Sequence, residues 1–128
     1  MPIRSRSASL FSVLGLLGHD LASAQDKVWA GDTLTGQRLY QAYCTRCHAV
    51  DENKIGPAHR GVYGRLAGSA PGYDYSTGLT YADFVWNART LDMWLKDPSA
   101  MVPWQQMDFQ VPDPQERAHL IAYLKTLR

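Results

Sequence analysis

Two cysteines and a histidine lie within a five-residue segment, and this motif constrains the chain more than any other feature. Cys44 and Cys47 are separated by two residues, His48 follows directly, and the chain has no other cysteine. The order C-x-x-C-H is the attachment signature of a c-type haem. Each thiol forms a thioether with one vinyl group of the porphyrin, and spacing within a helical turn lets both sulfurs reach the same ring edge. The adjacent imidazole of His48 then points at the iron.

Three other interpretations use the same residues. A redox-active dithiol uses the C-x-x-C but has no need of His48. A structural zinc site requires about four ligands, and the sequence has no second cysteine pair. A local disulfide, common in exported proteins, also leaves His48 unexplained. The sequence therefore favours one covalent haem c, attached through Cys44 and Cys47 and bound at its iron by His48.

The first 24 residues are predicted to be a secretory signal peptide. Arg4 and Arg6 supply a positive start, an apolar run covers residues 8–18, and a small-x-small pattern ends at Ala24. The apolar run is shorter than the roughly 20 residues that a bilayer crossing needs, and an uncleaved anchor is the alternative. We therefore expect export to the periplasm, no stable membrane insertion and a mature domain at residues 25–128.

The charge balance argues against nucleic acid as a partner. The full chain has 13 basic and 12 acidic residues, and removal of Arg4, Arg6 and Asp20 with the signal peptide leaves 11 of each. No segment is basic enough to bind a phosphate backbone. Apolar residues make up 45% and charged residues 20% of the chain, which is typical of a single globular domain. The default expectation is a monomer.

Helical patterns separated by long loops predict an all-α fold. The predicted helices are residues 32–43, residues 91–96 with Thr90 as N-cap and Pro98 as terminator, and a C-terminal helix that starts after Asp113, with Glu116 in a capping box. Glycine and proline mark residues 51–73 and 101–112 as loops. Gly36 is placed where a second helix could approach the first one closely.

The order of these elements resembles that of class I cytochromes c over nearly all of residues 31–128. The matching motifs are CTRCH at 44–48, IGP at 55–57, GVYGR at 61–65, PGYDYS at 71–76, Trp86, LDMWLKDP at 91–98, PWQQMDF at 103–109 and RAHLIAYL at 117–124. The resemblance is closest to soluble bacterial members. It implies a cytochrome c fold, with N- and C-terminal helices packed together and with loops and short helices wrapped around one covalent haem.

The resemblance also implies the second iron ligand. Met107 matches the family's sixth ligand, on the face of the haem opposite His48, and a thioether there raises the reduction potential. Met107 lies in a proline-containing loop between two predicted helices, where a strap can cross the haem. The other two nearby methionines are less suitable as ligands, because Met93 lies on a predicted helix and Met101 lies too close to the end of that helix.

Four further residues match positions that support the haem in the family. Pro57 matches the residue whose carbonyl accepts the other imidazole N–H of His48, which fixes the ring. The residues that match the propionate-binding positions are Arg65, Tyr75 and Trp86. A propionate inside a protein needs hydrogen-bond donors or a positive charge, and these three side chains supply both.

Several residues depart from the family pattern. Trp104 stands where glycine is usual, Trp94 where mitochondrial members have a tyrosine near the methionine sulfur, and His59 where an apolar residue packs on the haem. The lysines that surround the haem edge in mitochondrial members are also missing. Their positions are occupied by Ser99, Ala100 and Gln106.

The expected function is electron transfer and not enzymatic catalysis: a soluble monohaem cytochrome that carries single electrons between periplasmic or membrane-bound redox proteins. The expected partners are a membrane reductase or oxidase, or a periplasmic dehydrogenase. An open sixth position would favour a peroxidase-like enzyme or a gas-ligand sensor, and a subunit of a larger oxidoreductase is a further alternative. A mature net charge of zero and the missing lysine ring predict a weak dependence of reaction rate on ionic strength.

Overall fold

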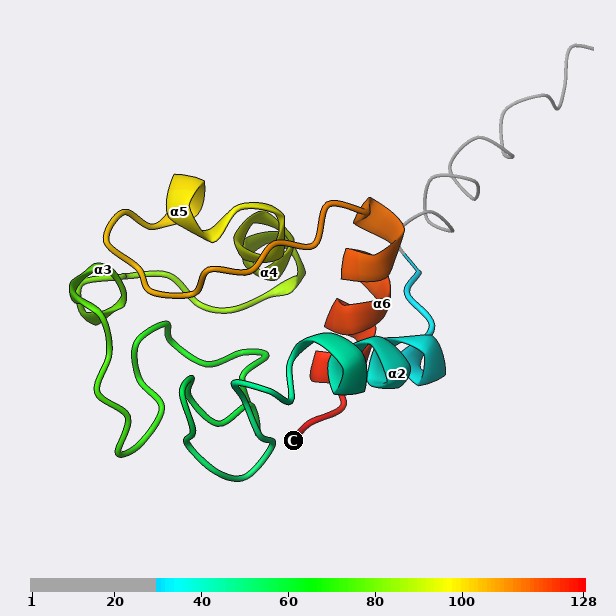
Figure 1. The fold of residues 1–128 in the computed structure, drawn as a ribbon, viewed down its shortest axis with the longest axis horizontal. Coiled ribbons are helices and arrows are strands. Elements are labelled where there is room, and N and C mark those ends of the chain that lie inside the picture. Colours follow the sequence, from blue (N-terminus) through cyan, green and yellow to red (C-terminus); the bar gives the residue numbers. More distant parts are fainter. Residues whose placement is uncertain (1–29) are drawn as a thin grey trace, which may run out of the picture.

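The computed structural model describes residues 30–128, so the predicted signal peptide lies outside the described residues and stays a prediction, as does the domain boundary at residue 25. The helices of the described part are α2 (Thr33–Tyr43), α3 (Thr77–Thr80), α4 (Ala88–Lys96), α5 (Pro98–Met101) and α6 (Pro114–Leu124) (Figure 1). Over residues 30–128, extended backbone pairs only at an isolated antiparallel bridge between Leu66 and Val85. The all-α prediction is confirmed.

The α2 helix has a side-chain cap at its start and a backbone cap at its end. The Asp32 side chain is the N-cap and accepts a hydrogen bond from the Thr35 N–H at 2.7 Å, which satisfies one of the free donors of the first turn. Cys44 is the C-cap, and its N–H donates to the Tyr40 carbonyl at 2.9 Å. The helix therefore holds the first cysteine of the motif at its last turn, as the sequence predicted.

The α4 helix starts earlier than predicted, and its N-cap is Asn87, not Thr90. The Asn87 side chain accepts from the Thr90 N–H at 3.0 Å, and the Thr90 hydroxyl accepts from the Asn87 N–H at 2.8 Å. Thr90 thus completes a reciprocal capping box instead of starting the helix. The helix ends at Lys96, as predicted, and Pro98 opens the short α5 helix.

The α6 helix begins as predicted, but the predicted use of Glu116 is wrong. Asp113 is the N-cap and accepts from the N–H of Gln115 at 2.7 Å, and Pro114 takes the first helical position. The Glu116 carboxylate accepts from the Tyr43 hydroxyl, with both oxygens at 3.2 Å, instead of returning to the N-cap. This carboxylate therefore joins α6 to the C-terminal turn of α2.

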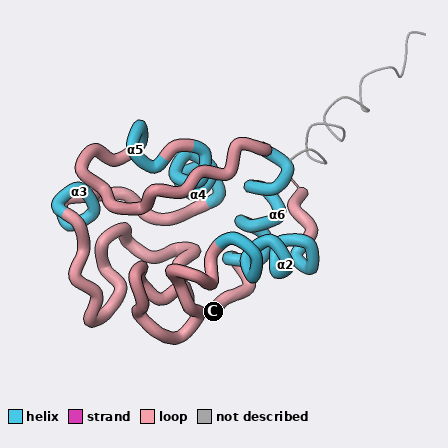
Figure 2. Tube along the Cα trace, in the orientation of Figure 1, coloured by secondary structure: helices cyan, strands magenta, loops and turns pink. Residues whose placement is uncertain are grey.

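The α2 and α6 helices pack closely against each other at one end of the molecule, while loops make up most of the other end (Figure 2). A Cβ atom at Gly36 would lie 1.9 Å from the His119 carbonyl oxygen, so only glycine permits this approach. Tyr40 and Tyr123 pack nearby with ring centroids 5.1 Å apart. The predicted role of Gly36 in a close helix approach agrees with this geometry.

A buried ion pair connects α6 to α4 and to the loop before α6. The Arg117 guanidinium donates to the Asp92 carboxylate at 2.7 Å and to the carbonyls of Val111 and Pro112, each at 2.9 Å. Arg117 is buried, so these acceptors replace the water that its charge would otherwise require. The two bonds from Arg117 to these carbonyls fix the end of the loop that carries Met107.

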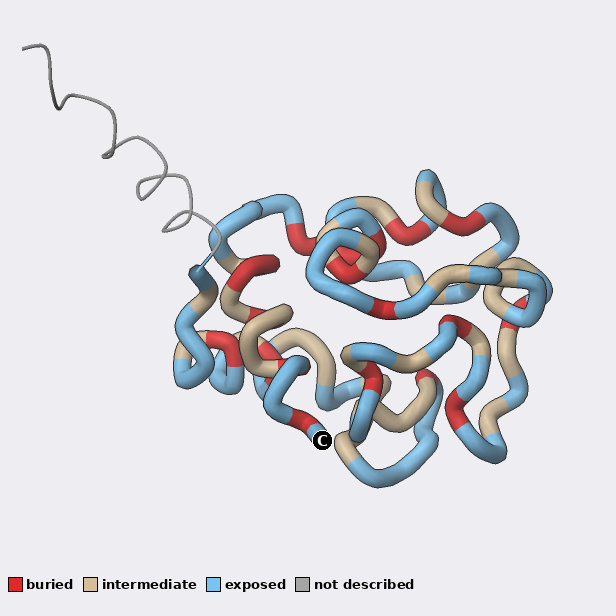
Figure 3. Tube along the Cα trace, turned by 180° about the vertical axis from the view of Figure 1, so that it is seen from behind, coloured by how far each residue is buried: buried red, intermediate tan, exposed pale blue. Residues whose placement is uncertain are grey.

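Buried positions alternate with exposed ones along both the helices and the loops (Figure 3). The core includes Leu120 of α6, Leu91 and Trp94 of α4, and Val62 and Ala67 of the long loop. The loops are thus part of the packed interior. Among residues 30–128, each helix falls short of the length and apolar character of a membrane span.

Replacement of Gly36 by alanine tests the α2–α6 contact. We expect Gly36→Ala to lower the free energy of unfolding by about 2–3 kcal/mol, because the new methyl group must push the α6 backbone away. Gln37→Ala, at an exposed position of the same helix, is the control and should stay within about 0.5 kcal/mol of the parent protein. Chemical denaturation of the haem-loaded protein measures both. Equal stabilities would contradict the contact.

Candidate haem-binding site

The three motif side chains are held by one tight turn after α2. The Cys44 carbonyl accepts from the N–H groups of Cys47 at 3.0 Å and of His48 at 2.8 Å. The Cys47 carbonyl in turn accepts from the Gly56 N–H at 2.8 Å. Both cysteines are unpaired and partly buried. The turn therefore presents two thiols and an imidazole together from a fixed backbone.

The environment of Cys44 disfavours the redox-active dithiol interpretation. Burial, and to a smaller extent the neighbouring Cys47, raises the pKa of the Cys44 thiol to about 12. A dithiol that exchanges disulfides needs the opposite, a thiol whose pKa is lowered so that the thiolate is populated. Among the described residues, no group of three or more histidine, cysteine or acidic side chains is arranged so that it could hold a metal ion by itself, so the zinc interpretation lacks ligands.

The His48 imidazole is oriented by a backbone carbonyl. Its Nδ1 lies 2.9 Å from the Pro57 carbonyl oxygen, so Nδ1–H donates there and the Nε2 lone pair is left for a metal. Burial lowers the pKa of His48, and the bond to Pro57 opposes this in part. Gly56 lies directly against the ring, since a Cβ there would be 2.1 Å from the His48 Cε1 atom.

His59 makes contacts that the sequence did not predict. Its ring stacks on His48 with centroids 4.1 Å apart and an interplanar angle of 20°. Its Nδ1 lies 3.0 Å from the hydroxyl oxygen of Tyr40, a buried residue of α2. Burial, with the nearby charges of His48 and Arg65, lowers the pKa of His59 well below its ordinary value. The sequence feature that could have indicated these contacts is a polar residue, His59, at a position where the resemblance implies an apolar one.

Met107 lies in the loop between α5 and α6 (Figure 1). The indole Nε1–H of Trp94 donates to the Met107 sulfur at 3.2 Å. Trp94 is buried in α4, and the side chains of Met107 and Cys44 both pack against the same core cluster. Trp94 therefore makes the contact that the resemblance assigns to a tyrosine.

Arg65 and Trp86 are brought together by the backbone around the Leu66–Val85 bridge. The Trp86 N–H donates to the Arg65 carbonyl at 2.9 Å. The guanidinium donates to the carbonyls of Ala58 at 3.0 Å and Arg60 at 3.1 Å. Its Nε is buried and has no hydrogen-bond partner among the described residues. An unpaired buried donor beside a positive charge fits an anionic group such as a haem propionate.

Tyr75 is hydrogen-bonded to a residue of the hollow that Arg65 lines, whereas Trp86 belongs to an aromatic cluster. A hollow of about 360 Å³ is lined by Val50, Asp51, Asn53, Ala58, Arg60, Arg65, Ala70 and Pro71. The Tyr75 hydroxyl accepts from the Ala70 N–H at 3.0 Å, which leaves its own hydrogen free to donate. Trp86 packs edge-to-face on Phe84 at 4.9 Å and on Trp94 at 5.4 Å. Trp94 thus touches both Trp86 and Met107.

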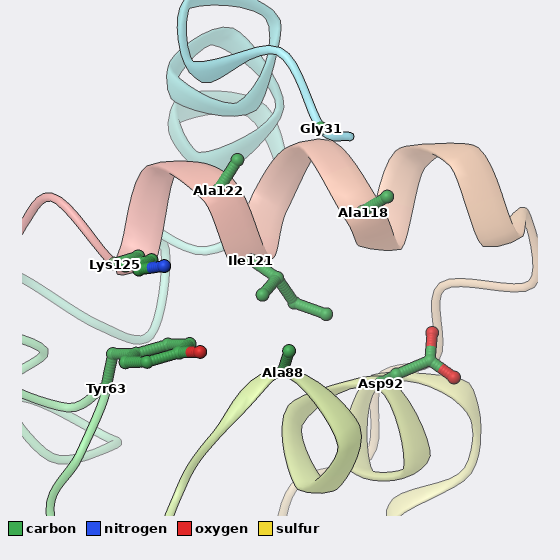
Figure 4. A pocket seen from close by; sticks show the side chains of 8 residues that line it. All are labelled: Gly31, Tyr63, Ala88, Asp92, Ala118, Ile121, Ala122 and Lys125. Carbon is green, nitrogen blue, oxygen red and sulfur yellow. The ribbon is translucent and has the colours of Figure 1, made fainter. Parts of the chain in front are cut away.

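A second hollow, of about 220 Å³, lies between α4 and α6 and contains none of the predicted site residues (Figure 4). Ile121 of α6 points toward Ala88 of α4, and Asp92 lines one end. At the other end the Lys125 ammonium lies 5.5 Å from the centre of the Tyr63 ring. This hollow lies between the two helices and is distinct from the candidate haem site.

Comparisons with known proteins identify the family. The cytochrome c family profile matches residues 34–128. Cytochrome c2 of Rhodopila globiformis is 40% identical over 77% of this chain and 95% of its own length, and cytochrome c of Sesamum indicum is 38% identical over 74% and 89%. The solved structure of cytochrome cH from Methylobacterium extorquens superimposes with a TM-score of 0.72 at 38% identity, covering 75% and 99% of the two chains. The chain belongs to the cytochrome c family.

Membership of this family settles the cofactor and the class of activity. The protein binds one covalent haem c and is a monohaem electron carrier, not an enzyme. The predicted family, fold and cofactor are therefore confirmed. The two cysteines, the oriented imidazole of His48 and the unpaired Arg65 donor fit this group.

The His59–Tyr40 contact can be tested by a double-mutant cycle. We expect His59→Leu alone to cost about 1–3 kcal/mol of stability, because the buried Tyr40 hydroxyl loses its partner. Tyr40→Phe added to His59→Leu should recover part of this loss, since the unpaired hydroxyl is then gone. Denaturation of the four haem-loaded proteins gives the coupling energy. Additive effects would show that the two side chains do not interact.

Proposed function

We propose that His48 and Met107 are the two axial ligands of the haem iron and that the protein shuttles single electrons between redox proteins. The observation that carries this proposal is the hydrogen bond, 3.2 Å long, from the buried Trp94 of α4 to the Met107 sulfur. A hydrogen bond to the sulfur fixes the position of that atom, which a methionine that only fills the apolar core does not require. His48 has the matching support at Pro57.

Both proposed ligands are held by neighbours that do not depend on the iron. The carbonyl of Pro57 fixes the plane of the His48 ring, and the indole of Trp94 fixes the Met107 sulfur. When bound, the haem supplies the one-electron couple, and a thioether ligand favours the ferrous state. Ligands held in this way stay in place in both oxidation states, so little structure must rearrange when an electron moves.

We assign Arg65, Tyr75 and Trp86 to the haem propionates. The buried Nε of Arg65 lacks a partner among residues 30–128, and the hydroxyl hydrogen of Tyr75 is free to donate. Trp86 offers an indole N–H from the aromatic cluster beside them. The attachment residues remain Cys44 and Cys47.

The proposed partners are a membrane reductase or oxidase, or a periplasmic dehydrogenase, met by a monomeric protein. The proposal of a periplasmic location rests on the signal-like pattern of residues 1–24. The similarity to proteins named cytochrome c2 is consistent with a carrier of this kind.

Met107→Ala tests the ligand assignment. The oxidised parent protein should show a weak absorption band near ~695 nm, and its reduced form should not respond to CO, because His/Met coordination leaves no open position. Met107→Ala should lose the band and bind CO, since alanine leaves one iron position open. Optical spectra of the oxidised and reduced proteins, with and without CO, measure both effects.

Met93→Ala is the matched control, because Met93 is a half-exposed methionine on α4. It should keep the band and stay silent to CO. A parent protein that lacks the band and binds CO would overturn the carrier proposal and favour a peroxidase-like enzyme or a gas sensor. A Met93→Ala variant that loses the band would move the ligand assignment to that residue.

Trp94→Phe should lower the reduction potential. The indole N–H draws electron density from the Met107 sulfur, so its removal makes the thioether a better donor to ferric iron. We expect a fall of roughly 20–60 mV, equivalent to about 0.5–1.4 kcal/mol for a single electron. Equilibrium redox titration measures the shift, and the ~695 nm band checks that the methionine is still bound. An unchanged potential would show that this hydrogen bond does not act on the iron.

A further inference from the structure

Trp104 combines two unfavourable features at one position of the Met107 loop. Its φ angle is 59°, and it is the only non-glycine residue with a positive φ among residues 30–128. Its side chain is 81% exposed. The left-handed region is disfavoured for residues with a Cβ atom, and an exposed indole gains nothing from burial. Folding therefore gives no reason for tryptophan where glycine is usual.

The backbone around Trp104 is braced. The Gly78 N–H of α3 donates to the Trp104 carbonyl at 3.4 Å, and a Cβ at Gly78 would lie 2.1 Å from the Pro103 carbonyl oxygen. The Gln105 side chain donates to the Ser99 hydroxyl at 2.9 Å and accepts from the Met107 N–H. The strained conformation is thus held from both sides, as expected at functional positions.

The two segments nearest Trp104 contain no charged residue, and an aspartate stands at each of their ends: Asp74, Asp83, Asp97 and Asp108. Residues 98–107 and residues 75–82 contain no aspartate, glutamate, lysine or arginine. The Gly78–Trp104 contact places these two segments side by side, at the end of the molecule where α3 lies (Figure 1). Tyr81, which ends α3, is 82% exposed. The two segments therefore form an uncharged surface around Trp104, bordered by aspartates and here called the Trp104 face, and each segment has one exposed aromatic residue.

We propose that the Trp104 face docks an uncharged, apolar surface of the redox partner protein, with Trp104 as its anchor. This proposal rests on the proposed electron-carrier function. Trp104 precedes the proposed ligand Met107 by three residues, so docking here brings the partner close to the iron. A tryptophan held rigidly at the centre of an interface is a common source of binding energy. A face with an uncharged centre and aspartates at its borders matches a neutral partner surface better than an acidic one.

A lipid bilayer is the other surface that exposed aromatic rings can contact. Segments that lie on membranes normally combine apolar residues with lysine and arginine, which bind anionic headgroups. Neither segment of the Trp104 face contains a basic residue. A protein surface is therefore favoured, and binding to lipid vesicles becomes one outcome of the test.

The test uses the haem-loaded protein and membrane vesicles from the source organism as electron acceptor. The variants are Trp104→Gly, which removes the ring and the backbone strain, and Trp104→Ala, which removes only the ring. Both should lower the second-order rate constant for reoxidation of the ferrous protein by about tenfold. Leu34→Ala, which truncates a side chain 64% exposed at the start of α2, should leave the rate unchanged.

Four further measurements isolate docking from other effects. Oxidation by ferricyanide and the reduction potential should be the same in all four proteins, because the haem itself is unaltered. The parent rate should change by less than about twofold between about 10 and 200 mM salt, because a neutral interface is little screened. Pure phosphatidylcholine vesicles, which contain no protein, should not bind the parent protein.

The outcomes separate this proposal from the proposed function. Parent-like rates in both Trp104 variants, a steep fall of rate with salt, or Trp104-dependent binding to the lipid vesicles would overturn the docking proposal alone. A decrease only in Trp104→Gly would assign the effect to the backbone and also overturn it. A parent protein that passes no electrons to the membranes would overturn the proposed function, and the docking proposal with it.

Discussion

The close contact between α2 and α6 is the interaction on which both halves of the haem site depend. The Asp32 N–H donates to His119 Nδ1 at 2.7 Å, Gly36 lies against the His119 carbonyl, and Tyr43 donates to Glu116. These contacts follow α2 from its first to its last residue. The motif turn starts at the next residue, and the loop that carries Met107 ends where α6 begins. Displacement of either helix would therefore move both proposed ligands relative to each other.

The proposed ligands depend on different kinds of support. His48 is held by local contacts, since Gly56 and Pro57 follow it within one loop. Met107 is held by contacts across the fold, through Trp94 of α4 and through the Arg117 bonds that fix the end of its loop. Loop backbones are held mainly by such contacts. The position of Met107 therefore depends on the packing of the whole fold, whereas that of His48 depends on its own loop.

The sequence predicted two helix starts from local order and the close helix approach at Gly36, but it missed the capping partners of Thr90 and Glu116 and the bond between His59 and Tyr40. The helix starts at Asp32 and Asp113 follow from side chains that accept nearby N–H groups. Thr90 is predicted as the N-cap of its helix, but the cap is Asn87, three residues earlier, which pairs with Thr90. The bond between His59 and Tyr40 spans 19 positions of the sequence, and no periodic pattern predicts a contact of that kind. The resemblance supplied Met107, Pro57 and Arg65, which the C-x-x-C-H spacing alone does not imply.

The departures from the family pattern differ in what they do to the fold. Trp94 takes over an existing task, because its N–H reaches the same sulfur that a tyrosine would. His59 is hydrogen-bonded to Tyr40, so its buried polar side chain does not remain unpaired. Trp104 has no such compensation inside the molecule, since its ring is exposed and its backbone is strained. A residue that costs the isolated protein stability is explained most directly by a second molecule, and the uncharged segments around Trp104, with aspartates at their borders, favour a neutral surface on that molecule.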